Sequence, residues 1–331
     1  MLQPFALHPR TVRQQFDRRA ANFEQNDYLL REIERRMFER LDVVKLAPAK
    51  ILDLGCGLGA GVAELARRYP QAETLGLDTS TKMIEAARKN LMPSAEGLFS
   101  RFMQSMGAGK SSRINFEVAD LASLPTPNDS VDLLWSNLVF HWLGVPEPAL
   151  KELYRVAKPG ALLMFSAFGV DTLQEIRPKS SKATGKVSPK PPPAAEPPSE
   201  SLPTSLMQFR DMHDWGDALV EVGFAEPVMD MERITLSFSE PKNLLKDLHN
   251  LGGNALAGRR GALSPRSLSD DLLRKLTQKT ANGEQLALTF EVIYGHAWVP
   301  AKKRRMDGLA TVDFLPRRPG KSPDSAKKPR F

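Results

Sequence analysis

Apolar residues near the start of the chain recur at the three- and four-residue spacing of an amphipathic helix. Within residues 11–46 they are Leu29, Leu30, Ile33, Met37, Phe38 and Leu41, with charged residues between them. Because this spacing gathers side chains on one helix face, it predicts a helical N-terminal segment. Further helices are predicted in residues 60–69, 80–91, 147–160, 212–224 and 240–252. The third of these should stop at Pro159 and Gly160.

Short, nearly continuous apolar runs lie between these helices and predict buried strands. They occupy residues 49–55, 73–78, 114–120, 131–140, 160–168, 227–238 and 285–299. Strands that alternate with helices are typical of a parallel sheet with helices on both faces. The chain is therefore predicted to be an α/β protein with a doubly wound, seven-stranded, mostly parallel sheet of Rossmann-like type.

Two segments interrupt this alternation. Residues 178–203 hold eight of the 26 prolines, and Val187 and Leu202 are their only large apolar residues. Such a composition cannot bury a core, so we predict a disordered insert. Residues 94–113 lengthen the connection before the third strand and are expected to form a surface excursion.

The formal net charge of +7 is concentrated at the C-terminal end. Residues 301–331 contain ten Lys and Arg against three Asp, so residues 1–300 are neutral overall. A basic run of this kind is usually a solvated, disordered end, and binding of nucleic acid or of an acidic partner is the sharper alternative. Near the N-terminus, Arg10, Arg13, Arg18 and Arg19 raise the alternative of a mitochondrial presequence, against which Asp17 and the lack of serine weigh.

Several classes of function receive no support from the composition. The single cysteine, Cys56, excludes an internal disulfide and fits a cytoplasmic protein. Together with five scattered histidines it gives no metal-ligand spacing, so no metal is expected. No apolar run approaches the roughly 18 residues of a membrane span, and the neutral fold suggests no nucleic-acid partner.

The glycine-rich turn "ILDLGCGLGAG", residues 51–61, carries the clearest chemical signal. Gly55, Gly57 and Gly59 follow a predicted strand and open a predicted helix, where backbone amides favour an anionic group. Asp78 ends the next strand, where its carboxylate can accept hydrogen bonds from ribose hydroxyls. These features suit a dinucleotide and S-adenosylmethionine equally, so the turn alone leaves both ligands open.

Three further features favour S-adenosylmethionine. Asp53 would repel a pyrophosphate but can face a cationic sulfonium ligand. Asp120 closes the third strand, where its side chain and the next amide, that of Leu121, can pair with the edge of adenine. The fourth strand runs into "SNLVFHWL", residues 136–143, which would stand beside a reactive methyl group.

This ordered set resembles the motifs of class I S-adenosylmethionine-dependent methyltransferases over residues 45–170. The resemblance implies a methyltransferase core under a helical N-terminal lid. It also implies a cofactor site lined by Asp53, Gly55, Gly57, Gly59, Asp78, Thr79, Met83, Asp120, Leu121 and Asn137.

A narrower resemblance rests on five blocks that occur in order: "VRQQFDRRAANFEQ", "SNLVFHWL", "FSAFGVDTLQEIR", "MHDWGDALVEVGFAEPVMDMERITL" and "LGGNALAGRRGAL". These are similar to the malonyl-acyl-carrier-protein O-methyltransferases of biotin synthesis, over residues 12–300 outside the two interruptions. The resemblance implies methylation of the free carboxylate of malonyl-acyl-carrier protein, an acidic partner, or of malonyl-CoA. The chain departs from the family at Phe23, usually tyrosine, and at Asp171, usually the glycine of a Gly-Thr-Leu motif.

The implied chemistry needs no general base. Carboxylic acids have a pKa of about 4, so the malonyl carboxylate is already ionised at neutral pH. Catalysis should come from alignment in a dry pocket. We expect the pocket walls to include Phe23, His141 and Trp142. The planar fork of an arginine suits the substrate carboxylate, and the candidates are Arg177, Arg259 and Arg260.

Taken together, the sequence predicts one methyltransferase domain with five parts. These are a lid (1–46), a cofactor-binding core (47–177), the disordered insert (178–203), a C-terminal part of the same domain (204–300) and the basic tail (301–331). The alternatives are methylation of another small carboxylic acid or quinone precursor, hydroxylation of a protein arginine in respiratory complex I assembly, and cofactor binding without turnover.

Overall fold

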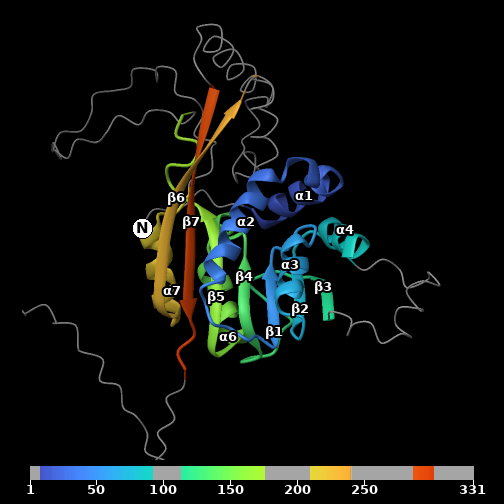
Figure 1. Cartoon of the computed structure of the whole chain (residues 1–331), viewed down its shortest axis with the longest axis vertical. Coiled ribbons are helices and arrows are strands. Elements are labelled where there is room, and N and C mark those ends of the chain that lie inside the picture. Colours follow the sequence, from blue (N-terminus) through green and yellow to red (C-terminus); the bar gives the residue numbers. More distant parts are fainter. Residues whose placement is uncertain (1–7, 92–112, 176–208, 239, 241–285, 302–331) are drawn as a thin grey trace, which may run out of the picture. The chain divides into compact units, whose positions relative to one another are not determined.

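A seven-stranded sheet forms the centre of the protein, in the order β3-β2-β1-β4-β5-β7-β6 (Figure 1). The structure is a computed structural model that describes residues 8–91, 113–175, 209–238, 240 and 286–301. The strands are β1 (Lys50–Leu54), β2 (Glu73–Asp78), β3 (Arg113–Val118), β4 (Val131–Ser136), β5 (Ala157–Phe168), β6 (Ala225–Phe238) and β7 (Leu286–Trp298). Strands β1 to β5 are parallel, and β7 runs antiparallel to both β5 and β6. The predicted fold class is confirmed.

Helices lie on both faces of the sheet. They are α1 (Pro9–Arg19), α2 (Tyr28–Leu41), α3 (Ala60–Arg68), α4 (Thr81–Leu91), α6 (Glu147–Val156) and α7 (Met212–Val222), with short 3₁₀ segments η1 (Ala20–Asn26) and η2 (Phe140–Trp142). The N-terminal helical stretch expected from the sequence is thus divided into α1, η1 and α2. The helix predicted in residues 240–252 lies outside the described residues. So do the insert, the tail beyond Ala301 and nearly all of residues 94–113.

One sequence expectation about a helix end is wrong. Helix α6 ends at Val156, and the next residue already belongs to β5, so Pro159 and Gly160 lie within the strand. Gly160 has a φ of +87°, and its amide donates a hydrogen bond to the carbonyl of Val299 at 2.8 Å. The glycine therefore shapes the first part of β5 instead of stopping the helix.

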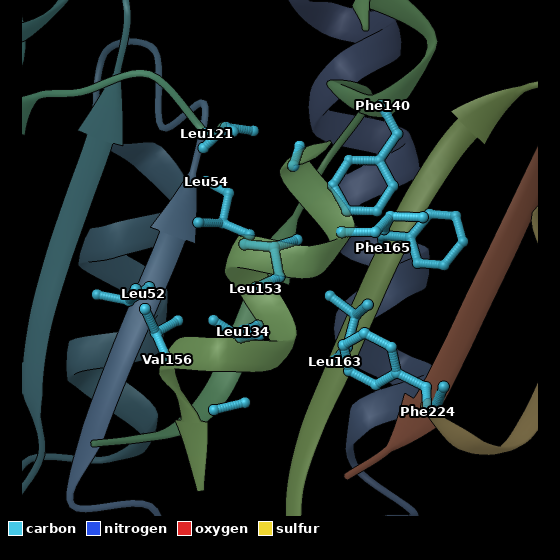
Figure 2. Close-up of a cluster of buried hydrophobic side chains, with 14 of the residues drawn as sticks. Leu52, Leu54, Leu121, Leu134, Phe140, Leu153, Val156, Leu163, Phe165 and Phe224 are labelled. Atoms are coloured by element: carbon cyan, nitrogen blue, oxygen red, sulfur yellow. The ribbon is translucent and has the colours of Figure 1, made fainter. Parts of the chain in front are cut away.

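The two faces of the sheet are covered by different helices, because successive strand residues point to opposite sides. Leu52 and Leu54 of β1 belong to a buried cluster with Leu153 and Val156 of α6, as Figure 2 shows. Ile51, of opposite parity, belongs to a second cluster with the apolar stripe of α2. The sheet is consequently buried on both sides, as a parallel sheet requires.

The stripe of α2 holds the N-terminal segment against the sheet. Its residues Leu29, Ile33, Met37 and Leu41, at intervals of four, are each no more than 1% exposed. Burial of a leucine or isoleucine of this kind stabilises the fold by about 1.5–3 kcal/mol. Salt bridges also join α2 to β6. They pair Arg36 with Glu232 and Arg40 with Asp230.

Strands β1 to β5, being parallel, end at the same edge of the sheet, and α1 lies over that edge (Figure 1). Helix α1 packs on α4, and the contact includes a 2.6 Å hydrogen bond from the Ser80 hydroxyl to Asp17. Ligands of open α/β sheets bind beyond the carboxyl ends of the strands. This edge is therefore where a functional site is expected.

Candidate active site

A cavity of about 410 Å³ lies at this edge of the sheet. Five segments supply most of its walls: α1 with η1, the glycine turn after β1, the end of β2, the turn after β3 and the loop after β4. Leu30 of α2, Ala149 of α6 and Phe168 of β5 complete them. We call α1 and η1, residues 9–26, the roof. The strand-end turns and loops opposite it form the floor. Of the charged residues that line the cavity, the floor supplies Asp78 and Asp120, and the roof supplies Arg19.

Two glycines of the turn have different surroundings. Gly57 lines the cavity with a φ of +53°, and a Cβ added there would meet only the Phe23 ring, at 3.8 Å. Gly59 has a φ of +88°, and its Cβ would lie 2.9 Å from Leu91 and from Phe116. Gly57 therefore leaves backbone open to a ligand, whereas Gly59 allows the turn to pack against α4 and β3.

Asp78 is fixed by the backbone around it. Its two carboxylate oxygens accept hydrogen bonds from the amides of Ser80, at 2.8 Å, and Gly57, at 3.1 Å. Burial raises the pKa of Asp78 to about 6, although both hydrogen bonds oppose the shift. The group is ionised at neutral pH, and a carboxylate with about four lone-pair sites still has acceptor capacity for two more donors.

The turn after β3 presents a second carboxylate. Asp120 is exposed, and its Oδ1 accepts the amide of Ala122 at 2.9 Å, which fixes the turn. Leu121, only 4% exposed, anchors the same turn in the core and also lines the cavity. A carboxylate, backbone amides and an apolar side chain thus lie together at this end of the cavity.

Asn137, in the loop after β4, joins three elements. Its Nδ2 donates to the carbonyl of Leu30 in α2 at 3.0 Å, and its Oδ1 accepts the hydroxyl of Ser166 in β5 at 2.8 Å. The Ser166 oxygen in turn accepts the amide of Leu138 at 2.9 Å. The side chain lines the cavity, and its hydrogen bonds hold this part of the floor to α2.

The roof is mainly hydrocarbon. Pro9, Val12, Phe16, Arg19 and Phe23 line the cavity at steps of three and four residues, one continuous helical stripe. Phe16 meets Trp142 of the floor edge-to-face, with ring centres 5.2 Å apart. The Arg19 guanidinium carbon is 5.9 Å from the centre of the Phe16 ring. Burial lowers the pKa of Arg19 from its ordinary value, but an arginine remains a cation in proteins.

His141 is a neutral part of the wall. It is 7% exposed and packs on Trp142 and Phe168, with ring centres 5.2 and 4.8 Å away. Burial lowers its pKa to about 3, so the imidazole carries no charge at neutral pH. Its Nδ1 has no hydrogen-bond partner among the described residues.

Comparison with known proteins assigns the family. Residues 52–165 match a family model described as a methyltransferase domain. A malonyl-acyl-carrier-protein O-methyltransferase from Laribacter hongkongensis is 38% identical over 96% of this chain and 100% of its own length. One from Gallionella capsiferriformans is 36% identical over 94% and 98%. The chain belongs to the malonyl-acyl-carrier-protein O-methyltransferase family. In fold it is similar to the YcgJ protein from Bacillus subtilis, with a TM-score of 0.50, 14% identity, and coverage of 80% of this chain and 98% of that one.

This O-methyltransferase brings most of the cofactor positions expected from the sequence to one cavity. The residues that line it are Gly55, Gly57, Asp78, Thr79, Asp120, Leu121 and Asn137. Asp53, Gly59 and Met83 lie among the buried residues and do not line it. Of the expected substrate positions, Phe23, His141 and Trp142 line the cavity, whereas Arg177, Arg259 and Arg260 lie outside the described residues.

Asp53 forms a buried pair with a carboxyl from α2. A Cβ on Gly61 would lie 2.7 Å from the Asp53 Oδ2 and 2.5 Å from the Glu34 Oε1, so the two carboxyl groups converge on this glycine. Burial, and then the charge of Glu34, raises the pKa of Asp53 well above its ordinary value. Burial also raises the pKa of Glu34 to about 7. The pair therefore holds a proton more strongly than free carboxyl groups do, behind the glycine turn.

Arg19 is the charged cavity residue that was not predicted from the sequence as a site residue. Its signal was present, because it continues the apolar stripe of Val12 and Phe16 at helical spacing. An arginine in such a stripe must face either the core or a ligand site. In the sequence, Arg19 stands out only with Arg10, Arg13 and Arg18 as the basic residues of a mitochondrial presequence, the alternative against which Asp17 weighs.

The described residues meet neither the requirements of a metal site nor those of a membrane-spanning helix. Their histidine, cysteine and acidic side chains form no group of three or more that could hold a metal ion. None of their helices is long and apolar enough to cross a lipid bilayer.

Proposed function

We propose that this O-methyltransferase transfers the methyl group of S-adenosylmethionine to the free carboxylate of malonyl-acyl-carrier protein, in biotin synthesis. The observation that carries the proposal is the mixed lining of one cavity. Two acidic side chains and open backbone of the floor share it with aromatic side chains and the cation of Arg19. The names of the relatives in this family supply the carrier-bound substrate.

The acidic side chains and open backbone of the floor fit the nucleoside of S-adenosylmethionine. Asp78 would accept the ribose hydroxyls, and the turn at Asp120 and Leu121 would bind the edge of adenine. Gly57 leaves space for the methionine part. When bound, the cofactor supplies a methyl group on a sulfonium, which a carboxylate oxygen can attack. Thr79 would lie beside the ribose, and Asp53 would act through the position of the glycine turn behind which it lies.

The roof, together with Trp142, fits the substrate. Arg19 would bind the malonyl carboxylate and hold one oxygen toward the methyl group, because a guanidinium binds a carboxylate through two parallel hydrogen bonds. Phe16, Phe23 and Trp142 would exclude water, which strengthens this ion pair. The neutral His141 adds no competing charge. The malonyl carboxylate is already ionised, so the residues contribute position and a dry environment and no proton transfer.

Mass spectrometry tests the proposal. Malonyl-acyl-carrier protein incubated with the enzyme and S-adenosylmethionine should gain the mass of one methyl group, and mild base should remove it as expected of an ester. Acetyl-acyl-carrier protein, which lacks a free carboxylate, should gain nothing. Cofactor binding without any methyl gain would overturn the proposal in favour of an assembly protein. A gain on small free acids alone would indicate a different substrate.

A further inference from the structure

The outer face of α1 carries three arginines that the proposed chemistry does not use. Arg10, Arg13 and Arg18 are exposed, and none forms a salt bridge with another described residue. The carboxylate of Asp17, the acidic residue of this helix, accepts the Ser80 hydroxyl and the Lys82 amide. At 1.5 Å per residue, the three arginines span about 12 Å along the helix.

This arrangement differs from that of exposed arginines elsewhere. On α2, Arg31 pairs with Asp27, and Arg35 pairs with Glu32. On α3, Arg67 pairs with Glu64. Those charges are compensated within their own helices. The positive charge on the outer face of α1 is not compensated in this way by described residues, so it produces a net field at the surface.

The same helix forms the roof of the cavity. Val12 and Phe16 on its inner side line the cavity, so the basic side lies directly above the site. Val145, which also lines the cavity, is 59% exposed and marks where the cavity meets solvent. A substrate carried on a flexible arm would therefore reach the cavity while its protein lay beside α1.

We propose that the outer face of α1, with Arg10, Arg13 and Arg18, is the docking surface for the acidic carrier protein. The inference rests on the proposed function, which gives the substrate as a carrier-bound thioester. Acyl-carrier proteins are acidic, and complementary charge at an interface acts mainly on the rate of association. Helix α1 thus contacts both parts of the substrate: its outer side binds the carrier protein, and its inner side covers the malonyl group.

A charge-neutral triple variant tests this surface. Arg10→Gln/Arg13→Gln/Arg18→Gln should lower kcat/KM for malonyl-acyl-carrier protein at least about tenfold at low ionic strength, the lower end of electrostatic steering. The loss should shrink in about 0.5 M salt, where charges are screened within about 3–5 Å. Turnover of malonyl-pantetheine, which has no carrier protein and no phosphate, should not change. The corresponding lysine variant, which keeps the charge, should retain nearly full activity.

Arg31→Gln/Arg35→Gln/Arg67→Gln is the matched control, because it removes three exposed charges from α2 and α3. It should leave both substrates unaffected. Equal loss of activity on both substrates in the α1 variant would show damage to the roof and overturn the proposal. Unchanged carrier kinetics would also overturn it, and removal of residues 302–331 would then test the basic tail as the dock. If the wild-type enzyme itself does not methylate the carrier substrate, the proposed function fails before the dock is at issue.

Discussion

The floor of the cavity and its roof differ in how their side chains are held. In the floor, Asp78 and Asn137 are tied by hydrogen bonds to backbone and to neighbouring strands. In the roof, Phe16 and Phe23 are placed by packing alone, and Arg19 supplies a single charge among them. A floor of this kind selects a small polar ligand by fixed hydrogen bonds. A roof of this kind selects by excluding water and by one ionic contact.

The largest effect is expected in the floor. Asp78→Ala removes the charge-assisted hydrogen bonding to the proposed ribose hydroxyls, and the net loss is taken as that of one such bond, about 1.5–3 kcal/mol. The affinity for S-adenosylmethionine should fall roughly 10- to 150-fold, measured by calorimetry. Asp217→Ala, an exposed position on α7, is the control. Unchanged affinity in a folded Asp78 variant would remove this residue from the cofactor site.

An intermediate effect is expected in the roof. Arg19→Gln should raise KM for malonyl-pantetheine roughly tenfold, since an ionic hydrogen bond contributes about 1.5 kcal/mol. The affinity for S-adenosylmethionine should stay the same. Measuring cofactor affinity therefore distinguishes the Arg19 variant of the roof from the Asp78 variant of the floor. Arg18→Gln, the exposed neighbour, should leave KM for this protein-free substrate unchanged. Weaker cofactor binding in the Arg19 variant would instead assign the guanidinium to the carboxylate of the cofactor.

The smallest effect concerns the contact between α2 and the turn behind the floor. The pKa of Glu34 is raised to about 7 in the folded state, above its ordinary 4.5. The folded protein therefore binds more protons than the unfolded chain in this range, and stability contributed by Glu34 falls as pH rises from about 4.5 to 7. Glu34→Gln removes this dependence and should raise the free energy of unfolding at pH 8 by about 1–2 kcal/mol, roughly half of what the full pKa shift would give, because the side chain is only half-buried.

Urea unfolding at pH 5 and pH 8 measures the Glu34 effect. Glu39→Gln, an exposed position on the same helix, is the control. If the wild type and the Glu34 variant lose equal stability between the two pH values, the carboxyl group is not desolvated as its burial beside Asp53 indicates.

The strands were predictable from the sequence because their signal is local. The short segment ETLGLD, with Leu75 and Leu77 at its centre, predicts β2 at its observed bounds. The end of α6 was not predictable from Pro159 and Gly160, because Gly160 is held by Val299, about 140 residues away. A pairing over that separation leaves no trace in a short window of sequence.

The candidate site was predictable to a similar degree and for the same reason. The glycine turn, Asp78 and Asp120 each follow a strand, and parallel strands end at one edge. Successive residues of a strand point to opposite faces of the sheet. Asp53 stands between Leu52 and Leu54 in β1, so its side chain lies on the opposite face from theirs, the face that α2 covers. The role of the roof depends on how α1 lies over the sheet, which spacing within one helix does not determine.

Asn137 limits which sequences this fold can use. Its amide gives a donor to Leu30 and an acceptor to Ser166, on two different elements. An aspartate at this position would offer two acceptors and no donor, and a leucine would offer neither. A glutamine would offer both groups, but on a side chain that is one methylene longer. A change at this position would leave the backbone carbonyl of Leu30 without its donor whatever residue stands in α2, and would need a compensating change at Ser166 in β5. Related sequences should diverge on the exposed faces of α2 and α3 long before they change this one side chain.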